Sequence, residues 1–294
     1  MIQRLHTWLV PIYLWILAAI IALWFYKWGR ILPQIFQGID IFSFLAIVGM
    51  YAFSHVFRML RLALLTLDKR EQILPLLSCH AVTALPSALL PFKIGEILRL
   101  GSFVYAIPGR QAFAIWLAER FCDISVIALF ILALYFFKVD VPPQLRLIFI
   151  MFFIFSLLAL TAFFAVAKVF IYLNRHLVLS SHSNHGLQLL KVSHQLRLLE
   201  ENILRCFEGR FASIVLLSIL VWACEMVGIG LFIKSISVDT KALSQFFLAG
   251  LSGVLEDDAH RSSFDFCRDL VLIAFSLFFG AILAVGRLIS RPQT

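Results

Sequence analysis

The sequence predicts an all-α protein, a polytopic transmembrane helical bundle that occupies residues 1–294 as a single integral membrane domain. Apolar residues make up 62% of the chain and charged residues only 14%, whereas soluble proteins have about 45–50% and about 25%. The mean hydropathy is +0.95. Many apolar residues form solid runs of about 20, the length that crosses a bilayer as a helix, without the alternation of a β-barrel. Ionisable residues interrupt some runs, which is typical of a functional site inside a membrane protein.

Six apolar runs are predicted to cross the membrane as helices. They cover residues 9–27, 40–59, 111–137, 147–172, 211–234 and 270–287. No small-residue cleavage site follows the first run, so we expect it to remain as a helix rather than to be removed as a signal peptide. Arg261 and Arg268 are interpreted as residues that flank the last helix outside the membrane.

Two further apolar segments, residues 73–92 and 243–255, are predicted to be broken and re-entrant, each returning to the side from which it entered. Prolines stand at three positions of the first segment, Pro75, Pro86 and Pro91. Because proline lacks an amide donor and disturbs the residues before it, we do not expect an uninterrupted helix there. The second segment would span only about 20 Å as a helix at about 1.5 Å per residue, which is too short to cross.

The loop of residues 174–210 is the largest segment predicted to lie outside the membrane. Its apolar side chains recur every three or four residues, which predicts an amphipathic helix on the membrane surface. If the N-terminus is cytoplasmic and residues 73–92 re-enter, this basic loop is also cytoplasmic, as the positive-inside tendency favours. Such loops explain the net charge of +8. No basic stretch carries a nucleic-acid-binding motif, so no nucleic-acid partner is expected.

The two halves of the chain share a pattern that predicts an inverted repeat. Gly95 and Glu96 precede a helix that carries Arg120. Gly253 and Glu256 precede the last helix, which carries Arg287. The two broken segments would enter from opposite sides, so inversion would relate the halves. Inverted repeats whose broken helices meet near the middle of the membrane recur among transporters.

The first candidate binding site follows the broken segment of residues 73–92. A helix that begins near Ile94 would direct its first amides toward this break, which favours an anionic ligand. Lys93 and Arg99 add positive charge beside it, and Gly95 stands at the turn. Glu96 is three residues from Arg99 and can pair with it on one helix face. We expect Arg99 and Lys93 to contact a phosphate group, because arginine binds phosphate oxygens in pairs.

Three charged residues lie within the next predicted span, Glu119, Arg120 and Asp123, and must face the interior of the bundle. One interpretation is an ion-pair network that holds helices together; the other is a polar pathway for a charged headgroup. Glu225, midway along a later span, is a further carboxylate. It could partner Arg120 or carry protons in a coupled cycle.

His55, Arg58 and Arg61 are interpreted more simply. They stand near the predicted end of the second span, where arginine side chains reach the interface without a special function. His80, within the first broken segment, is interpreted as a hydrogen-bonded structural residue.

The sequence predicts neither a cofactor nor a metal site. The five cysteines are scattered, without the spacing of a zinc site or a disulfide framework. No nucleotide-binding motif of the GxxxxGK[ST] kind is present. We therefore do not expect a catalytic centre from these patterns.

At LPFKIGEILRL, followed by AERFCDI, the chain resembles the lysylphosphatidylglycerol synthase transmembrane family, also described as flippase-like membrane proteins. The matching positions are Pro91, Gly95, Glu96, Arg99, Glu119, Arg120 and Asp123. A second family motif, a glycine-rich turn that ends in Gly-x-x-Glu, is matched only by Gly250, Gly253 and Glu256, without its usual proline and paired glycines.

This resemblance implies a multi-pass protein of the bacterial or archaeal cytoplasmic (inner) membrane. It implies a flippase or transporter for an anionic phospholipid or a polyprenyl-phosphate-linked glycolipid precursor. The synthase members carry a soluble aminoacyl-transferase domain after the membrane part; this chain ends at Thr294, so we expect no aminoacyl transfer and no enzyme activity. The alternative is a membrane enzyme, or an accessory subunit, that acts on a lipid phosphate in cell-envelope lipid or glycan synthesis, with Asp257–His260 as its candidate residues. Expected partners are membrane lipids and a glycosyltransferase or lipid-synthesis enzyme.

Overall fold

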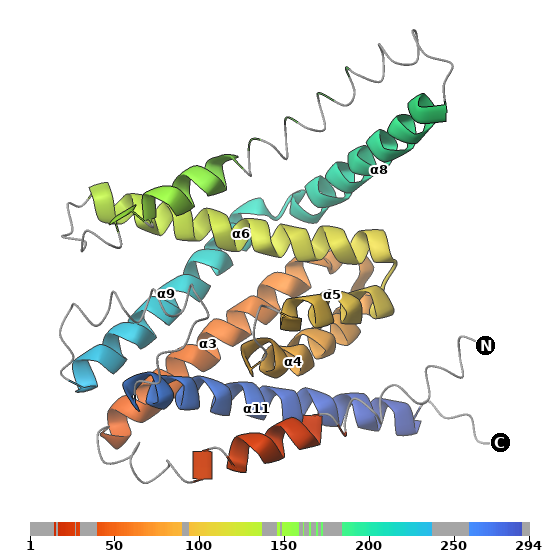
Figure 1. Ribbon diagram of the computed structural model, residues 1–294. Coiled ribbons are helices and arrows are strands. Elements are labelled where there is room, and N and C mark those ends of the chain that lie inside the picture. The colour runs from red at the N-terminus through yellow and green to blue at the C-terminus, as the bar shows by residue number, and fades with distance from the viewer. Residues whose placement is uncertain are drawn as a thin grey trace. The chain divides into compact units, whose positions relative to one another are not determined.

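The prediction of an all-α protein is confirmed. The computed structural model describes residues 15, 17–26, 28–29, 40–89, 94–136, 146–147, 149–158, 161, 165, 169, 172, 184–236 and 259–289. These residues form helices joined by short turns, and no strand occurs among them (Figure 1). The elements are α3 (Ile41–Leu65), the 3-10 helix η1 (Leu67–Gln72), α4 (Ile73–Leu89), α5 (Ile94–Ala106), α6 (Gly109–Phe136), α8 (Asn184–Phe207), α9 (Phe211–Ile236) and α11 (Ala259–Ile289). Two shorter apolar helices are Leu17–Tyr26 and Phe149–Leu158.

The chain divides into two compact units that are interleaved along the sequence. Unit 1 comprises Met1–Met59, Leu74–Ser102 and Ala223–Thr294, and unit 2 comprises Leu60–Ile73 and Phe103–Trp222. The boundaries fall inside α3, α4, α5 and α9, so these helices contribute residues to both units. The predicted spans 40–59, 111–137 and 211–234 correspond to α3, α6 and α9.

The exposed side of α3 is apolar, whereas its opposite side carries polar residues beside buried apolar ones such as Ile47 and Leu62. Phe42 and Phe53 are exposed, whereas Tyr51, His55 and Arg58 lie on the opposite face of the helix. A surface helix of a soluble protein has the reverse arrangement. Among the described residues, Ile41–Leu65 and Phe211–Phe232 are long and apolar enough to cross a membrane. The arrangement of α3 is therefore that of a helix with lipid on one side and a polar interior on the other.

Helix α4 corrects one sequence prediction, because it runs without interruption from Ile73 to Leu89 and contains Pro86. One proline removes a single backbone donor, and hydroxyl groups in the same stretch bond to backbone carbonyls. Thr83 Oγ1 donates to the Cys79 carbonyl at 2.7 Å, and Ser87 Oγ donates to the Thr83 carbonyl at 2.8 Å. The next helix begins at Ile94, as predicted. Re-entry of this segment stays a prediction, and residues 243–255 lie outside the described residues.

Helix α11 begins at Ala259, well before the predicted start at residue 270. Its early turns pack against the helix near the N-terminus, where Trp24 stacks on Phe266 with 5.3 Å between ring centroids. Trp28 and Leu85 of α4 belong to the same buried cluster. This packing stabilises a stretch whose charges suggested a loop, so Arg268 lies within the helix rather than outside it. α11 and the N-terminal helix lie side by side in Figure 1.

Helix α8 confirms the helix predicted within the loop 174–210. In unit 2 it packs against α6. A tight turn joins α8 to α9, and Gly209 adopts a φ of 70° there, a conformation that favours glycine. Arg210 in this turn donates to the Leu64 carbonyl at 2.9 Å and pairs with Asp68. The end of α3 and the start of α9 therefore lie together.

Cys206, in the last turn of α8, is expected to react slowly with thiol reagents. Burial raises the pKa of its thiol to about 11, and only the thiolate is a nucleophile. The maleimide labelling rate of a variant with Cys206 as its sole cysteine should therefore rise with pH up to about pH 11. Cysteine placed at the half-exposed Val192 of the same helix should react fast near pH 8.5, the ordinary thiol pKa. Equal rates at both positions at neutral pH would contradict the buried placement.

Candidate functional site

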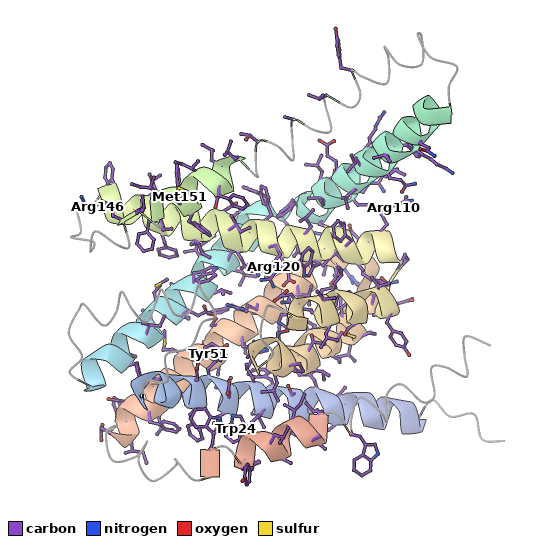
Figure 2. The ribbon with its side chains drawn as sticks, in the orientation of Figure 1. Trp24, Tyr51, Arg110, Arg120, Arg146 and Met151 are labelled. Atoms are coloured by element: carbon purple, nitrogen blue, oxygen red, sulfur yellow. The ribbon has the colours of Figure 1, made fainter. Side chains whose placement is uncertain are left out.

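A stripe of polar side chains on α3 forms the centre of the candidate site in unit 1. Tyr51, His55 and Arg58 follow one another at four- and three-residue steps, so they share one helix face. Arg58 forms an ion pair with Glu225 of α9. Ser54 Oγ donates to the same carboxylate at 3.0 Å. Figure 2 marks Tyr51 on α3. The stripe begins near the middle of the helix, at a depth where isolated charges are costly.

Two buried histidines face each other beside this stripe. The rings of His55 and His80 of α4 are 5.3 Å apart between centroids. Phe275 of α11 contacts His55 edge-on at 4.8 Å. The charges of Arg58 and Arg99 both act on His55. Residues from α3, α4, α5 and α11 thus meet in one cluster inside unit 1.

The start of α5 is packed tightly on α4. A Cβ atom on Gly95 would lie 2.0 Å from Ser87 Cα, so only glycine fits this contact. Arg99, on the next turn of α5, is buried, and its guanidinium lies 3.8 Å from the carboxylate of Glu96. The predicted pairing of Glu96 with Arg99 is therefore confirmed. The close helix contact brings the positive end of α5 against α4, and Arg99 follows Gly95 by four residues on the same helix face.

A charged group on α11 was not predicted as part of the site. Arg268 lies 3.1 Å from Asp265 and 3.5 Å from Asp269. Asp269 is fully buried and accepts a hydrogen bond of 3.2 Å from the indole N–H of Trp24, which Figure 2 labels beside α11. The Tyr51 side chain interacts electrostatically with Arg268 and Asp269 of α11. It interacts in the same way with Arg58 and Glu225. The α11 group therefore borders the α3 stripe.

Unit 2 contains a separate ion-pair network around Arg61 of α3. Its guanidinium donates to Asp123 Oδ1 at 2.7 Å and to Ser218 Oγ of α9 at 3.1 Å. It also lies 3.8 Å from Glu119 Oε1. The side chains of Arg61 and Glu119 are 1% and 0% exposed, so both charges are removed from solvent. Such a network joins α3, α6 and α9.

Arg120 of α6 lies at the edge of this network. Its guanidinium is 3.5 Å from Oδ2 of Asp123, which lies three residues further along the same helix. The Arg120 side chain is more exposed than that of Asp123. Arg61 and Arg120 thus balance Glu119 and Asp123, and the network is neutral.

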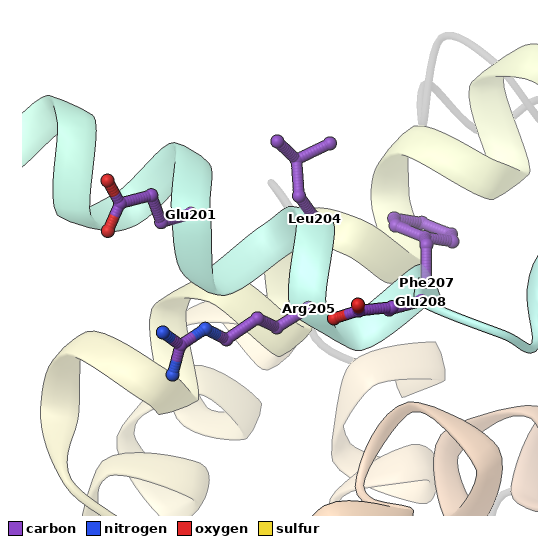
Figure 3. A pocket seen from close by; sticks show the side chains of 5 residues that line it. All are labelled: Glu201, Leu204, Arg205, Phe207 and Glu208. Carbon is purple, nitrogen blue, oxygen red and sulfur yellow. The ribbon is translucent and has the colours of Figure 1, made fainter.

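A depression on α8 contains none of the predicted site residues. It has a volume of about 450 Å³ and is lined by Glu201, Leu204, Arg205, Phe207 and Glu208. Figure 3 shows that these side chains come from the last turns of α8 and the turn that follows. Leu204 is half exposed, so the depression is a surface feature.

A comparison with known protein families identifies the family of this chain. The model of the lysylphosphatidylglycerol synthase TM region family matches residues 12–255. The chain belongs to this family. Neither curated proteins nor solved structures gave a match. Membership in this family, together with the apolar helices α3 and α9, identifies a membrane protein that belongs to a lipid-related group.

The residues that match the family motifs fall in both units. Gly95, Glu96 and Arg99 lie in unit 1 on α5, and Glu119, Arg120 and Asp123 lie in unit 2 on α6. Glu225 belongs to unit 1. The two other predicted site residues, Lys93 and Glu256, lie outside the described residues, as do residues 257 and 258. The structure therefore gives two clusters, one centred on His55 and one on Arg61.

The simple interpretation of His55, Arg58 and Arg61 was wrong. His55 and Arg61 are buried among other helices, and the partly buried Arg58 pairs with Glu225 of α9. The reason is that α3 continues to Leu65, so Arg61 lies within the helix and not at its end. Glu225 pairs with Arg58 and not with Arg120, the partner suggested from the sequence.

Proposed function

We propose that this membrane protein moves a lipid with an anionic headgroup between the two leaflets. One observation carries the proposal: a polar stripe on the buried face of α3, next to the buried Arg99, in a helix whose opposite face is exposed and apolar. Charged side chains at membrane depth are costly and mark ion or substrate pathways. In this proposal the headgroup passes along the polar side while the acyl chains remain in lipid.

The chemistry of the cluster favours a phosphate group as the recognised part of the headgroup. Arg58 and Arg99 both lie near enough to His55 for their positive charges to act on it. The planar guanidinium fork binds phosphate oxygens in pairs. An anionic phospholipid and a polyprenyl-phosphate-linked sugar share this group, and both are substrates that fit the proposal. Movement against a gradient would need coupling, for example to protons.

The contacts of Arg210 support a topology with an even number of crossings between α3 and α9. The end of α3 and the start of α9 lie together, through the bonds of Arg210 to Leu64 and Asp68. If α6 and the predicted span 147–172 each cross once, α4 and α5 together must begin and end on the same side. Re-entry of α4 and α5 meets this condition. In the proposed orientation the N-terminus and the basic helix α8 face the cytoplasm of a bacterial or archaeal cell.

Replacement of Arg99 by alanine is expected to slow leaflet exchange about tenfold or more. The estimate follows from the loss of hydrogen bonds to a charged group, worth about 1.5–3 kcal/mol, since about 1.4 kcal/mol is a factor of ten. The measurement uses the purified protein in proteoliposomes that contain a fluorescent phosphatidylglycerol. Dithionite bleaches only the outer leaflet, so the later decay of fluorescence reports exchange.

Arg197→Ala serves as the matched control, because the Arg197 side chain on α8 is 62% exposed and pairs with Glu201 on the surface of the helix. This variant should exchange lipid at the rate of the unsubstituted protein. Exchange by Arg99→Ala at that same rate would remove Arg99 from the proposed pathway. Liposomes with protein that show no exchange beyond protein-free liposomes would refute the transport function itself.

A further inference from the structure

His55 has a polar atom that the described structure leaves without a hydrogen-bond partner. The side chain is 4% exposed, and among the described residues none bonds to its Nε2 atom. A buried polar atom without a partner costs about 1–3 kcal/mol. Buried polar groups are therefore almost always satisfied, and the exceptions need an explanation.

The surroundings of His55 limit what such a partner is. Phe275 closes one side of the ring and His80 lies against it. The two charges that act on His55 are both positive, those of Arg58 and Arg99. Arg58 is three residues further along the same helix face, and Arg99 comes from α5, whose N-terminal end also favours an anion. An imidazole in its Nε2–H tautomer donates one hydrogen bond, so the fitting partner is an acceptor oxygen on a negatively charged group.

We propose that His55 is a ligand-binding residue, whose Nε2–H donates to a phosphate oxygen of a lipid headgroup held by Arg58 and Arg99. This inference rests on the proposed function and names the atom that recognises the headgroup. The sequence placed His55 with residues of no special function, because nothing in a lone histidine near Arg58 and Arg61 indicates a ligand. The burial of its ring and the two cations from different helices reveal the role.

Two substitutions that differ by one methylene group test the position of the donor. The amide of His55→Gln can reach the place of Nε2, whereas that of His55→Asn ends near Nδ1. We expect His55→Gln to bind phosphatidylglycerol within about threefold of the unsubstituted protein and His55→Asn to bind it about tenfold or more weakly, as for a lost hydrogen bond to a charged group. The measurement is a titration of the purified full-length protein in detergent with fluorescent phosphatidylglycerol. Equal thermal melting of the two variants shows that both are folded.

Each outcome decides the inference separately from the transport function. Equal affinity of His55→Asn and His55→Gln would refute the role of Nε2. Displacement of the lipid by excess inorganic phosphate would overturn the lipid headgroup as the ligand and identify free phosphate instead; we expect the lipid to remain bound. Because binding at equilibrium needs no leaflet exchange, binding that depends on Nε2 in a protein without exchange would leave this inference intact and refute only the proposed function.

Discussion

Replacement of Gly95 by alanine is expected to destabilise the protein strongly. The added Cβ would lie 2.0 Å from Ser87 Cα and 2.6 Å from Ser87 N. Both are backbone atoms of α4, so no side-chain rotation relieves the clash and the two helices must move apart. Overpacking in a closely packed region costs about 1–3 kcal/mol and sometimes more, and a clash of backbone with backbone belongs at the upper end. Thermal melting of the purified protein in detergent measures this effect.

Gly101→Ala is the matched control for this prediction. Gly101 lies on the same helix, and no atom of the described residues would lie within 4 Å of a Cβ there. Because alanine favours helix over glycine by about 0.8–1 kcal/mol, Gly101→Ala should melt at the same temperature as the unsubstituted protein or higher. If Gly95→Ala also melts unchanged, α5 does not approach α4 as described. The family-motif glycine would then need an explanation other than packing.

The sequence predicted the long helices well but not all of their ends. Solid apolar runs predicted α3, α6 and α9 because about 20 apolar residues are a sufficient signal for a span. The start of α11 could not be predicted, since its early turns carry Arg261, Asp265 and Arg268. These turns are helical because Phe266 packs on Trp24, a contact between distant parts of the chain. The continuity of α4 was missed for a related reason: one proline does not end a helix that its neighbours hold.

Charged residues at membrane depth could be found from the sequence, but their partners could not. The pairs Glu96–Arg99 and Arg120–Asp123 were predictable, because three-residue spacing places side chains together on a helix. Arg61 and Asp123 are 62 positions apart, and Arg58 and Glu225 are 167 apart. A single sequence has no signal for such pairs. The polar positions at four- and three-residue steps on α3 were a usable sign, because they are helical neighbours in an apolar run.

Replacement of Arg61 by alanine is the second change expected to have a large effect. It would leave Glu119 and Asp123, both buried, without the guanidinium that lies 3.8 Å and 2.7 Å from them. Removal of one partner from a buried ion pair costs about 3–5 kcal/mol, because it leaves an uncompensated charge in a region of low polarity. We expect the free energy of unfolding, measured by titration of the detergent-solubilised protein with sodium dodecyl sulfate, to fall by about that amount. Arg197→Ala should change it little, as exposed ion pairs contribute about 0–1 kcal/mol.

A compensating variant separates the charge effect from the loss of packing. If the cost of Arg61→Ala comes from unpaired carboxylates, neutral amides at Glu119→Gln and Asp123→Asn should restore part of the stability in the triple variant. A cavity alone would not be repaired by these isosteric changes, so an unrestored triple variant would indicate packing as the cause. Lost leaflet exchange in a triple variant with restored stability would favour a polar pathway through unit 2. Retained exchange would favour a network that serves to hold α3, α6 and α9 together.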